Sequence, residues 1–455
     1  MTGFVFLLAF ASLPLLGLVI WRLPSVAALP LPARVAAGAA AGAVFLTVAM
    51  LLFSLAGIPW SVPLLALLPL ASGLSVLFHG RGGRSRFETP GHFPAAALSL
   101  AVAAVLLAAY SAATARATSM DLLFFWGSKG LHFAKARALD TAFLTLPGHG
   151  LMHPGYPPLL PLLYAWASLA AGRMAWGASL LTMPLFLLWT VLAFRGFSRR
   201  PLGERGSAQH TALLAALLAF GLTNSLSAGN AEPALLFFET ITLCALTFGE
   251  RGPDSEWLAS LGLAGAVMTK VEGVAFAAAV GAAFLLFSRE RSRRFASLLR
   301  LALAPLLFLG CWLIFIARHG IADSYAGREY GAFSLGHWRE VVTGVLTSAS
   351  FGIAYLPWIA LATLVLLGRS RRALPFLLAA AAYVVFIVFS YLHGESDPRE
   401  WILWSGSRLL LTPLLILFFG AAAASGPEGD LRDVQELQSH GLREIDPAKS
   451  SSAPC

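Results

Sequence analysis

Asp121 is the first residue of this chain whose type and position suit catalysis. It stands near the start of a long polar loop and is followed by five apolar or aromatic residues, Leu122 to Trp126. A carboxylate held at such an interface is partly desolvated and fixed in place, as a general base must be. Lys129 lies eight residues further on, close to the same helical face, and is one of only four lysines. Alternatively, both residues simply mark the headgroup level of an interfacial helix.

Two acidic residues lie at the start of a later apolar segment and within it. Glu232 precedes Pro233, and Glu239 follows seven residues later on the same helical stripe, about 10 Å deeper. An acid at that depth is costly unless it is paired or faces a cavity, so we interpret Glu239 as a protonated or paired packing residue. Glu232 is either part of a site or a helix-start acid favoured by the helix dipole.

Three further charges interrupt apolar sequence. Lys270 and Glu272 occupy the short turn of an apolar hairpin, where they could also form a self-contained pair. Arg408 stands at the entrance of the last apolar segment, and the guanidinium fork suits phosphate. Three outer-loop histidines are too far apart for a local metal motif and are expected to be structural or exposed; they are His153, His337 and His393.

The rest of the chain explains why these charges stand out. Of its 455 residues, 58% are hydrophobic and 12% are charged, about half the charge of a soluble domain. This composition excludes a secreted enzyme, a DNA-binding factor and a disordered regulator. Runs of arginine separate apolar segments and indicate cytoplasmic loops. They lack interleaved aromatic residues, so no nucleic-acid partner is expected, and the three cysteines show no paired spacing. The runs are Arg81–Arg86, Arg195–Arg205, Arg289–Arg294 and Arg369–Arg372.

The segment lengths predict an all-α, polytopic integral membrane protein with about 13 transmembrane helices. We divide the chain into N-terminal transmembrane helices (1–113), an extracytoplasmic loop with interfacial helices (114–157), a transmembrane core (158–424) and a cytosolic, largely disordered tail (425–455). Pro158–Gly172 is expected to be a half-inserted helix. The predicted crossings are Phe4–Ile20, Arg34–Ala56, Ser61–Phe78, Pro94–Ala113, Met174–Phe194, Thr211–Gly229, Pro233–Gly249, Trp257–Thr269, Gly273–Phe287, Leu301–Ala317, Val345–Leu367, Ala373–Leu392 and Leu409–Ala424.

The order of these motifs resembles a known family. Asp121, then Trp126, Gly127 and Lys129, then His153-Pro154-Gly155-Tyr156-Pro157-Pro158 are similar to the bacterial GT-C glycosyltransferases related to the protein O-mannosyltransferases (family 39) and the lipid A aminoarabinose transferase. Ala231-Glu232 resembles a later acidic position of the family, usually Ala-Asp. Thr269 to Gly273 and Trp404 to Leu410 are similar to its Thr-Lys-x-Glu-Gly and Ser-x-x-Arg-Leu-Leu elements. The resemblance covers about Asp121 to Leu410 and implies the GT-C fold, with Asp121 as catalytic base.

We therefore expect an inverting glycosyltransferase that moves a sugar from a polyprenyl-phosphate donor to a hydroxyl of a protein, lipid or cell-envelope glycan. Its site would face the extracytoplasmic side of a bacterial membrane. Arg408, Lys270 and Lys129 would bind the donor phosphate. No metal ligand set and no certain cofactor are predicted, although Glu232 and Glu272 could orient a divalent ion or the acceptor. The remaining substrate contacts would come from Trp126, Tyr156 and His153. The alternatives are a transporter or lipid flippase, which would use Glu239 and the turn from Lys270 to Glu272, and a noncatalytic assembly subunit.

Overall fold

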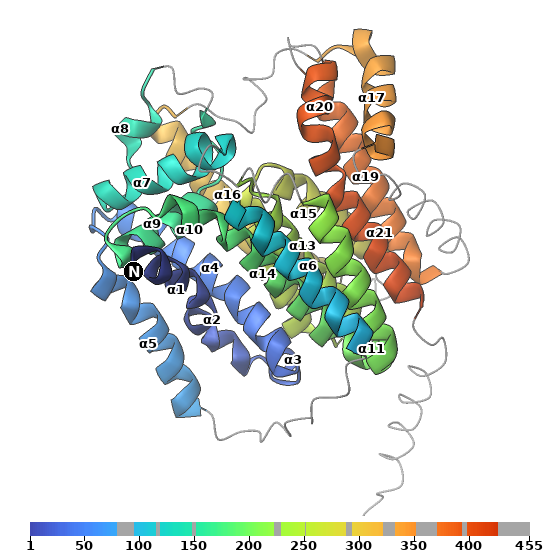
Figure 1. Cartoon of the computed structure of the whole chain (residues 1–455), viewed down its shortest axis with the longest axis horizontal. Helices are drawn as coiled ribbons and strands as arrows, with labels where there is room; N and C mark the ends of the chain where they lie inside the picture. The colour runs from blue at the N-terminus through green and yellow to red at the C-terminus, as the bar shows by residue number, and fades with distance from the viewer. Residues whose placement is uncertain are drawn as a thin grey trace, which may run out of the picture.

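A computed structural model of the chain describes residues 1–79, 95–114, 119–147, 152–222, 229–250, 252–287, 294–321, 333–351, 371–393 and 398–425. These residues form helices and turns with no β-strand, which confirms the all-α prediction for the described part (Figure 1). Their N-terminal half contains α1 (Thr2–Ala11), α2 (Leu13–Leu16), η1 (Leu18–Arg22), α3 (Pro24–Ala27), α4 (Leu31–Leu55), α5 (Val62–His79), α6 (Ala95–Thr114), η2 (Asp121–Trp126), α7 (Gly127–Ala136), α8 (Thr141–Leu144), α9 (Leu159–Ala171), α10 (Trp176–Leu180) and α11 (Thr182–Gly221).

The C-terminal half supplies most of the charged residues discussed below. In Figure 1, α17 and α20 lie side by side and project from one end of the molecule, while α19 and α21 pack against each other below them. The elements of this half are α13 (Glu232–Phe248), α14 (Pro253–Thr269), α15 (Glu272–Leu286), α16 (Arg294–Arg318), η5 (Leu335–His337), α17 (Trp338–Phe351), η6 (Arg371–Ala373), α19 (Leu374–Tyr391), α20 (Pro398–Leu409) and α21 (Leu411–Ala424).

Seven helical segments of the described part are long and apolar enough to cross a membrane, so the chain is a membrane protein. Three shorter apolar helices accompany them: Val62–Leu74, Leu159–Ala171 and Glu272–Leu286. Most of the predicted crossing at 345–367, the arginine-rich segment at 81–86 and the tail beyond residue 425 lie outside the described residues. The seven segments are Thr2–Arg22, Leu31–Leu55, Ala95–Thr114, Trp176–Gly221, Arg294–Arg318, Leu374–Tyr391 and Pro398–Ala424.

The first predicted crossing is not one straight helix. It is divided into α1, α2 and η1, because Pro14 has no N–H to continue the helical hydrogen bonds. Gly17 then lies directly against the backbone of α4, where a Cβ would come within 2.0 Å of the Gly38 carbonyl oxygen. The break therefore allows two backbones to approach closely, a common packing mode in membrane proteins.

Helix α11 contains the predicted arginine turn between two apolar runs. Gly203 has a left-handed conformation (φ 69°), and Ser198 Oγ lies 2.7 Å from Ser207 Oγ. Nine residues of continuous helix would separate those side chains by about 13.5 Å. The chain therefore reverses at Gly203, and α11 is a pair of helices that fold back on each other.

The half-inserted segment predicted at Pro158–Gly172 is the helix α9, which ends at the left-handed Gly172 (φ 76°). Its 13 residues span about 20 Å, short of the roughly 30 Å hydrocarbon core of a bilayer. Helix α9 packs against α1, α4 and α7, and its residues from Leu159 to Ser168 are buried. It therefore supports α7 from inside the protein. Its depth in the bilayer stays a prediction.

The helical hairpin of α13 and α14 sets the level of the charged residues. A Cβ on Gly265 of α14 would come within 2.1 Å of the Phe238 ring of α13, so the two helices are in close contact. Each helix has 17 residues and the two run in opposite directions. The start of α13, at Glu232, and the residue after α14, Lys270, therefore lie at the same end of the hairpin.

Candidate functional site

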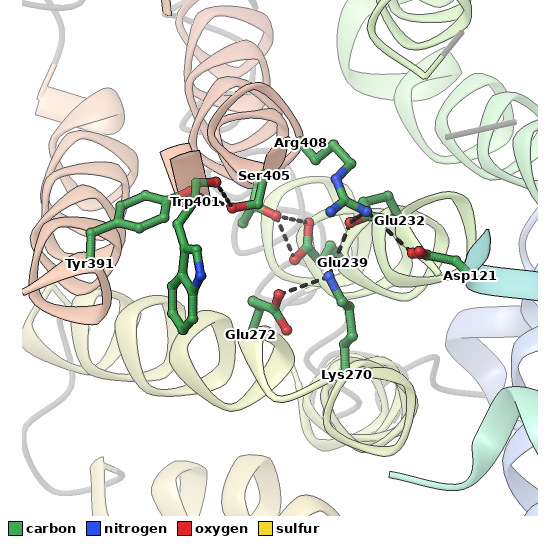
Figure 2. Close-up of polar contacts among 10 residues, drawn as sticks. Asp121, Glu232, Glu239, Lys270, Glu272, Tyr391, Trp401, Ser405 and Arg408 are labelled. Carbon is green, nitrogen blue, oxygen red and sulfur yellow. Dashed lines mark hydrogen bonds and ion pairs between the residues drawn. The ribbon is translucent and has the colours of Figure 1, made fainter. Parts of the chain in front are cut away.

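Asp121 and Arg408 are 287 positions apart in the sequence and form an ion pair in the structure. Arg408 Nη1 donates to Asp121 Oδ2 at 3.3 Å (Figure 2). Asn230 bridges the same pair when its amide is assigned the orientation that satisfies both atoms: the nitrogen then donates to Asp121 Oδ2 at 2.5 Å, and the oxygen accepts from Arg408 Nη1 at 2.6 Å. The fold thus places the expected base directly beside the expected phosphate-binding arginine.

The ion pair continues into a second group of charges. Arg408 Nη1 lies 3.6 Å from Glu232 Oε1, and Lys270 Nζ lies 3.0 Å from the same oxygen. Lys270 Nζ is also 2.8 Å from Glu272 Oε1. We call Asp121, Asn230, Glu232, Lys270, Glu272 and Arg408 the charged cluster. Five of its six members were selected from the sequence, and all six lie at one end of the α13–α14 hairpin.

Local sequence explains how three members of the cluster are placed. Pro233 suits the first turn of α13 and leaves Glu232 at the helix N-terminus, where a carboxylate is favoured. Lys270 has an extended backbone (φ −155°, ψ 157°), which ends α14 before α15 begins at Glu272. Asp121 begins the π-helical segment η2, a rare conformation often found at functional sites.

Burial divides the cluster into an outer and an inner part. The side chains of Asp121 and Arg408 keep 24% and 22% of their surface exposed, whereas Glu232 keeps 5%. Three polar atoms of the cluster are buried with no hydrogen-bond partner among the described residues: Glu232 Oε2, Glu272 Oε2 and Arg408 Nε. Buried polar atoms are costly when unpaired, so these atoms are suited to contact a polar ligand.

The pKa values of Asp121, in the loop, and Lys270, in the turn, are both raised, but for different reasons. Burial, together with the neighbouring Glu232 carboxylate, raises the pKa of Asp121 above its ordinary value despite the opposing effect of Arg408. Burial acts to lower the pKa of Lys270, but Glu232 and Glu272 overcome it and raise that pKa above its ordinary value. Lys270 is therefore a permanent cation, while Asp121 can take up a proton more readily than a free aspartate.

The phosphate-binding role expected of Lys129 stays a prediction, and its contacts in the structure are with a loop and two aromatic rings. It is 2% exposed, and its Nζ donates to the carbonyl oxygen of His153 at 2.5 Å. The same Nζ lies 5.8 Å from the ring centre of Trp126 and 6.0 Å from that of Tyr156. Because an ammonium group held by a carbonyl and two aromatic faces is already solvated by the protein, we assign Lys129 to loop support.

The segment that Lys129 supports carries two of the expected substrate contacts. His153 has a left-handed backbone (φ 45°), and its ring stacks on Tyr156 at 4.6 Å. Tyr156 in turn lies 5.9 Å from Trp126, which is 2% exposed. Trp312 Nε1 fixes the same segment by donating to the Gly155 carbonyl at 3.0 Å. The three predicted aromatic residues therefore form one packed group, which contacts Lys129.

The other two outer-loop histidines, His337 and His393, make local contacts. His337 Nδ1 lies 3.1 Å from Glu340 Oε2, and His393 Nδ1 lies 3.0 Å from the Phe389 carbonyl oxygen. Among the described residues, no three His, Cys, Asp or Glu side chains are grouped so that they could hold a metal ion.

Sequence reasoning missed two functional candidates. Asn230 directly precedes the Ala231-Glu232 motif, and that adjacency was the available signal. Thr412 contacts Glu239, with Oγ1 at 2.9 and 3.0 Å from the two carboxyl oxygens. A threonine within an apolar helix has no sequence signal of its own, because its hydroxyl can always bond within the helix.

Comparison with protein-family models gave no match, and neither the search of curated proteins nor the search of solved structures found a similar chain.

Proposed function

We propose that this protein is an integral-membrane glycosyltransferase. It would transfer a sugar from a polyprenyl-phosphate carrier to a hydroxyl of a protein, lipid or cell-envelope glycan. The observation that carries the proposal is the contact between Asp121 and Arg408, with Asn230 bridging them. A base and a phosphate-binding cation, both partly exposed and side by side, are what a displacement at a sugar phosphate requires.

The proposed topology has about 13 crossings, with the arginine-rich turns in the cytoplasm. The charged cluster and the loop at 114–157 would then lie on the extracytoplasmic side of a bacterial membrane. A lipid-linked donor stays in the bilayer, so its phosphate must be met by cations at headgroup depth. Arg408 and Lys270 are suited to that position, since each is held by carboxylates at the end of a helix.

The reaction would be a single displacement. The acceptor oxygen attacks the anomeric carbon while the bond from that carbon to the phosphate oxygen breaks. Asp121 takes the proton of the acceptor hydroxyl, and the leaving phosphate keeps the bonding electrons. Arg408 and Lys270 stabilise the charge that develops on the phosphate. One displacement without a covalent enzyme intermediate inverts the anomeric carbon.

Glu232 and Glu272 would serve the acceptor or the sugar. Each has one carboxyl oxygen bound to Lys270 and a second that is buried with no partner among the described residues. A carboxylate oxygen accepts hydrogen bonds from hydroxyl groups, so both are suited to orient a polyol. The same oxygens are the ligands that a divalent ion would use. The packed group of Trp126, Tyr156 and His153 would form the wall on the side of the loop.

A transporter or lipid flippase is the alternative from another class. It is favoured by one observation: Glu239 is fully buried one level below the charged cluster, as an intramembrane ion path would require. In that case Glu239 would carry a proton or an ion, and Asp121 would not be needed for any bond cleavage.

The experiment is a donor-consumption assay. Membranes containing the protein are incubated with radiolabelled polyprenyl-phosphate sugars, and release of the free carrier phosphate is followed. Asp121→Asn should abolish release, because the amide cannot accept the proton. The matched control is Asp140→Asn in the same loop, where the side chain caps α8 by accepting from the Phe143 N–H at 2.9 Å, a role asparagine retains. Undiminished release in Asp121→Asn contradicts the proposal, and no release with any donor favours the transporter.

A further inference from the structure

Below the charged cluster, a second contact joins α13 to α21, the helix that follows the one carrying Arg408. Thr412 Oγ1, in the first turn of α21, lies 2.9 Å from Glu239 Oε1 and 3.0 Å from Oε2, in the middle of α13. Glu239 is fully buried and Thr412 is 3% exposed. Neither residue contacts Asp121 in the described structure, so the pair needs an explanation of its own.

The two contacts are related by helical geometry. Glu239 follows Glu232 by seven residues and Thr412 follows Arg408 by four, and both spacings return to the same helical face. The contact from Arg408 to Glu232, at 3.6 Å, therefore links α20 to α13, and the contact from Thr412 to Glu239 links α21 to α13 one level further along. The inner contact sets how deep the α21 segment lies against α13.

The chain between Arg408 and Thr412 contains a joint. Helix α20 ends at Leu409 and α21 begins at Leu411. Pro413 has no N–H for the Leu409 carbonyl, so one helical hydrogen bond across the joint is missing. Without a contact on its far side, such a joint would let the segment that carries Arg408 tilt relative to α13.

The partner of Glu239 also indicates its charge. Within the described residues its hydrogen bonds come from the neutral hydroxyl of Thr412, and no lysine or arginine pairs with it. A buried carboxylate without a cation is far more costly than a neutral carboxyl group. Glu239 is therefore a neutral acid in this arrangement.

We infer that Glu239 and Thr412 form a positioning pair: a neutral carboxyl and a hydroxyl that fix α21 against α13 and thereby hold Arg408 beside Asp121 and Glu232. The catalytic consequence rests on the proposed function above, whereas the structural one does not. Glu239 and Thr412 would act through Arg408 and would not touch the substrate.

The structural test needs no substrate. Spin labels are placed at Phe124→Cys on η2 and Leu403→Cys on α20, positions 50% and 79% exposed, in a chain carrying Cys311→Ser and Cys455→Ser. The distance between them reports how the Arg408 segment lies relative to the Asp121 segment. Thr412→Val should shift or broaden that distance. The control Thr190→Val removes a buried hydroxyl that donates only to its own helix, at the Phe186 carbonyl, and should leave it unchanged. An unchanged distance in Thr412→Val overturns the inference.

The catalytic test separates positioning from ionisation. Thr412→Val and Glu239→Leu should lower kcat about tenfold while the donor KM changes less than about twofold, because misplaced charge stabilisation acts on the transition state. Glu239→Gln keeps a neutral hydrogen-bonding partner for Thr412, so its kcat should stay close to that of the wild type. Infrared spectra should show a protonated carboxyl band in the wild type that is lost in Glu239→Gln. Full loss of turnover in Glu239→Gln overturns the inference. If the wild type consumes no donor, the proposed function fails, and the label distance still decides the positioning pair.

Discussion

Two sets of charged residues in this protein contain the same residue types but differ in how far apart their members lie in the sequence. At the turn of α11, Arg195 and Arg199 both pair with Glu204, at most nine positions away in the sequence. In the charged cluster, Arg408 pairs with Asp121 at a separation of 287 positions. The first group lies within one hairpin, whereas the second brings together segments that are far apart in the sequence.

Burial sharpens the difference between the two groups. Glu204 keeps 36% of its side-chain surface exposed, whereas Glu232 keeps 5%. A carboxylate that stays partly exposed keeps part of its hydration, whereas a buried one must first overcome a desolvation cost of several kcal/mol. The turn of α11 therefore has a smaller desolvation cost on folding than the charged cluster. The comparison fits the proposal that the charged cluster has a chemical role, whereas the arginine turn has only local contacts to explain it.

The largest expected effect concerns the shared cation of the cluster. Lys270→Met removes the ammonium group that contacts both Glu232 and Glu272 and leaves buried carboxylates without it. We expect the free energy of unfolding to fall by about 3–5 kcal/mol, the usual cost of removing one partner of a buried ion pair. Thermal unfolding of the detergent-solubilised protein measures this loss.

The matched change at the arginine turn is Arg199→Met, which should cost less than about 1 kcal/mol because Arg195 still pairs with Glu204 near the surface. The double variant Lys270→Met, Glu272→Gln should recover part of the loss, since it removes one of the stranded charges. Equal losses at the two sites would show that burial does not distinguish them.

The second effect is on turnover. Arg408→Ala should lower kcat about 10²- to 10³-fold, the usual cost of removing one group that stabilises developing charge. Arg408→Lys keeps the charge but loses the planar guanidinium whose Nη1 contacts Asp121, Asn230 and Glu232, so it should recover only part of this. Single-turnover kinetics with a radiolabelled polyprenyl-phosphate sugar measure the chemical step. Arg199→Ala, at the arginine turn, should leave kcat unchanged, and a similar loss there would mean that Arg408 acts only through folding.

How far the sequence predicted these two groups depends on the scarcity of charge. In a chain with 12% charged residues, a charge beside an apolar run is conspicuous, and this was enough to select Asp121, Glu232, Lys270, Glu272 and Arg408. It was also enough to predict an all-α membrane protein and a polar turn at Arg195–Arg205. Length and polarity alone carried these predictions, so they needed no knowledge of tertiary packing.

The sequence did not indicate the contacts that depend on tertiary packing. Lys129 has the same charge and interfacial setting as Lys270, yet its partners are the His153 carbonyl and two aromatic rings, contacts that depend on how α7 packs on α9. Asn230 and Thr412 carry no charge, so the scarcity of charge did not mark them, and only Asn230 had a signal in its position beside Glu232. The break of the first apolar run at Pro14 follows a known rule, but the close contact of Gly17 with α4 does not.

The smallest expected effect is a displacement of the pH profile. Asp121 must be ionised to act as a base, and burial together with Glu232 raises its pKa, so it keeps its proton to a higher pH than a free aspartate. The acid limb of kcat/KM should therefore lie above the range of an ordinary aspartate. Glu232→Gln removes a negative neighbour and releases Arg408 and Lys270 from it, and both changes favour the carboxylate form of Asp121. The acid limb should then move to lower pH, whereas Glu204→Gln at the arginine turn should leave it in place. An acid limb that stays fixed or moves to higher pH in Glu232→Gln would show that Asp121 is not the group that titrates. The proposed difference between the charged cluster and the arginine turn would then lose its main support.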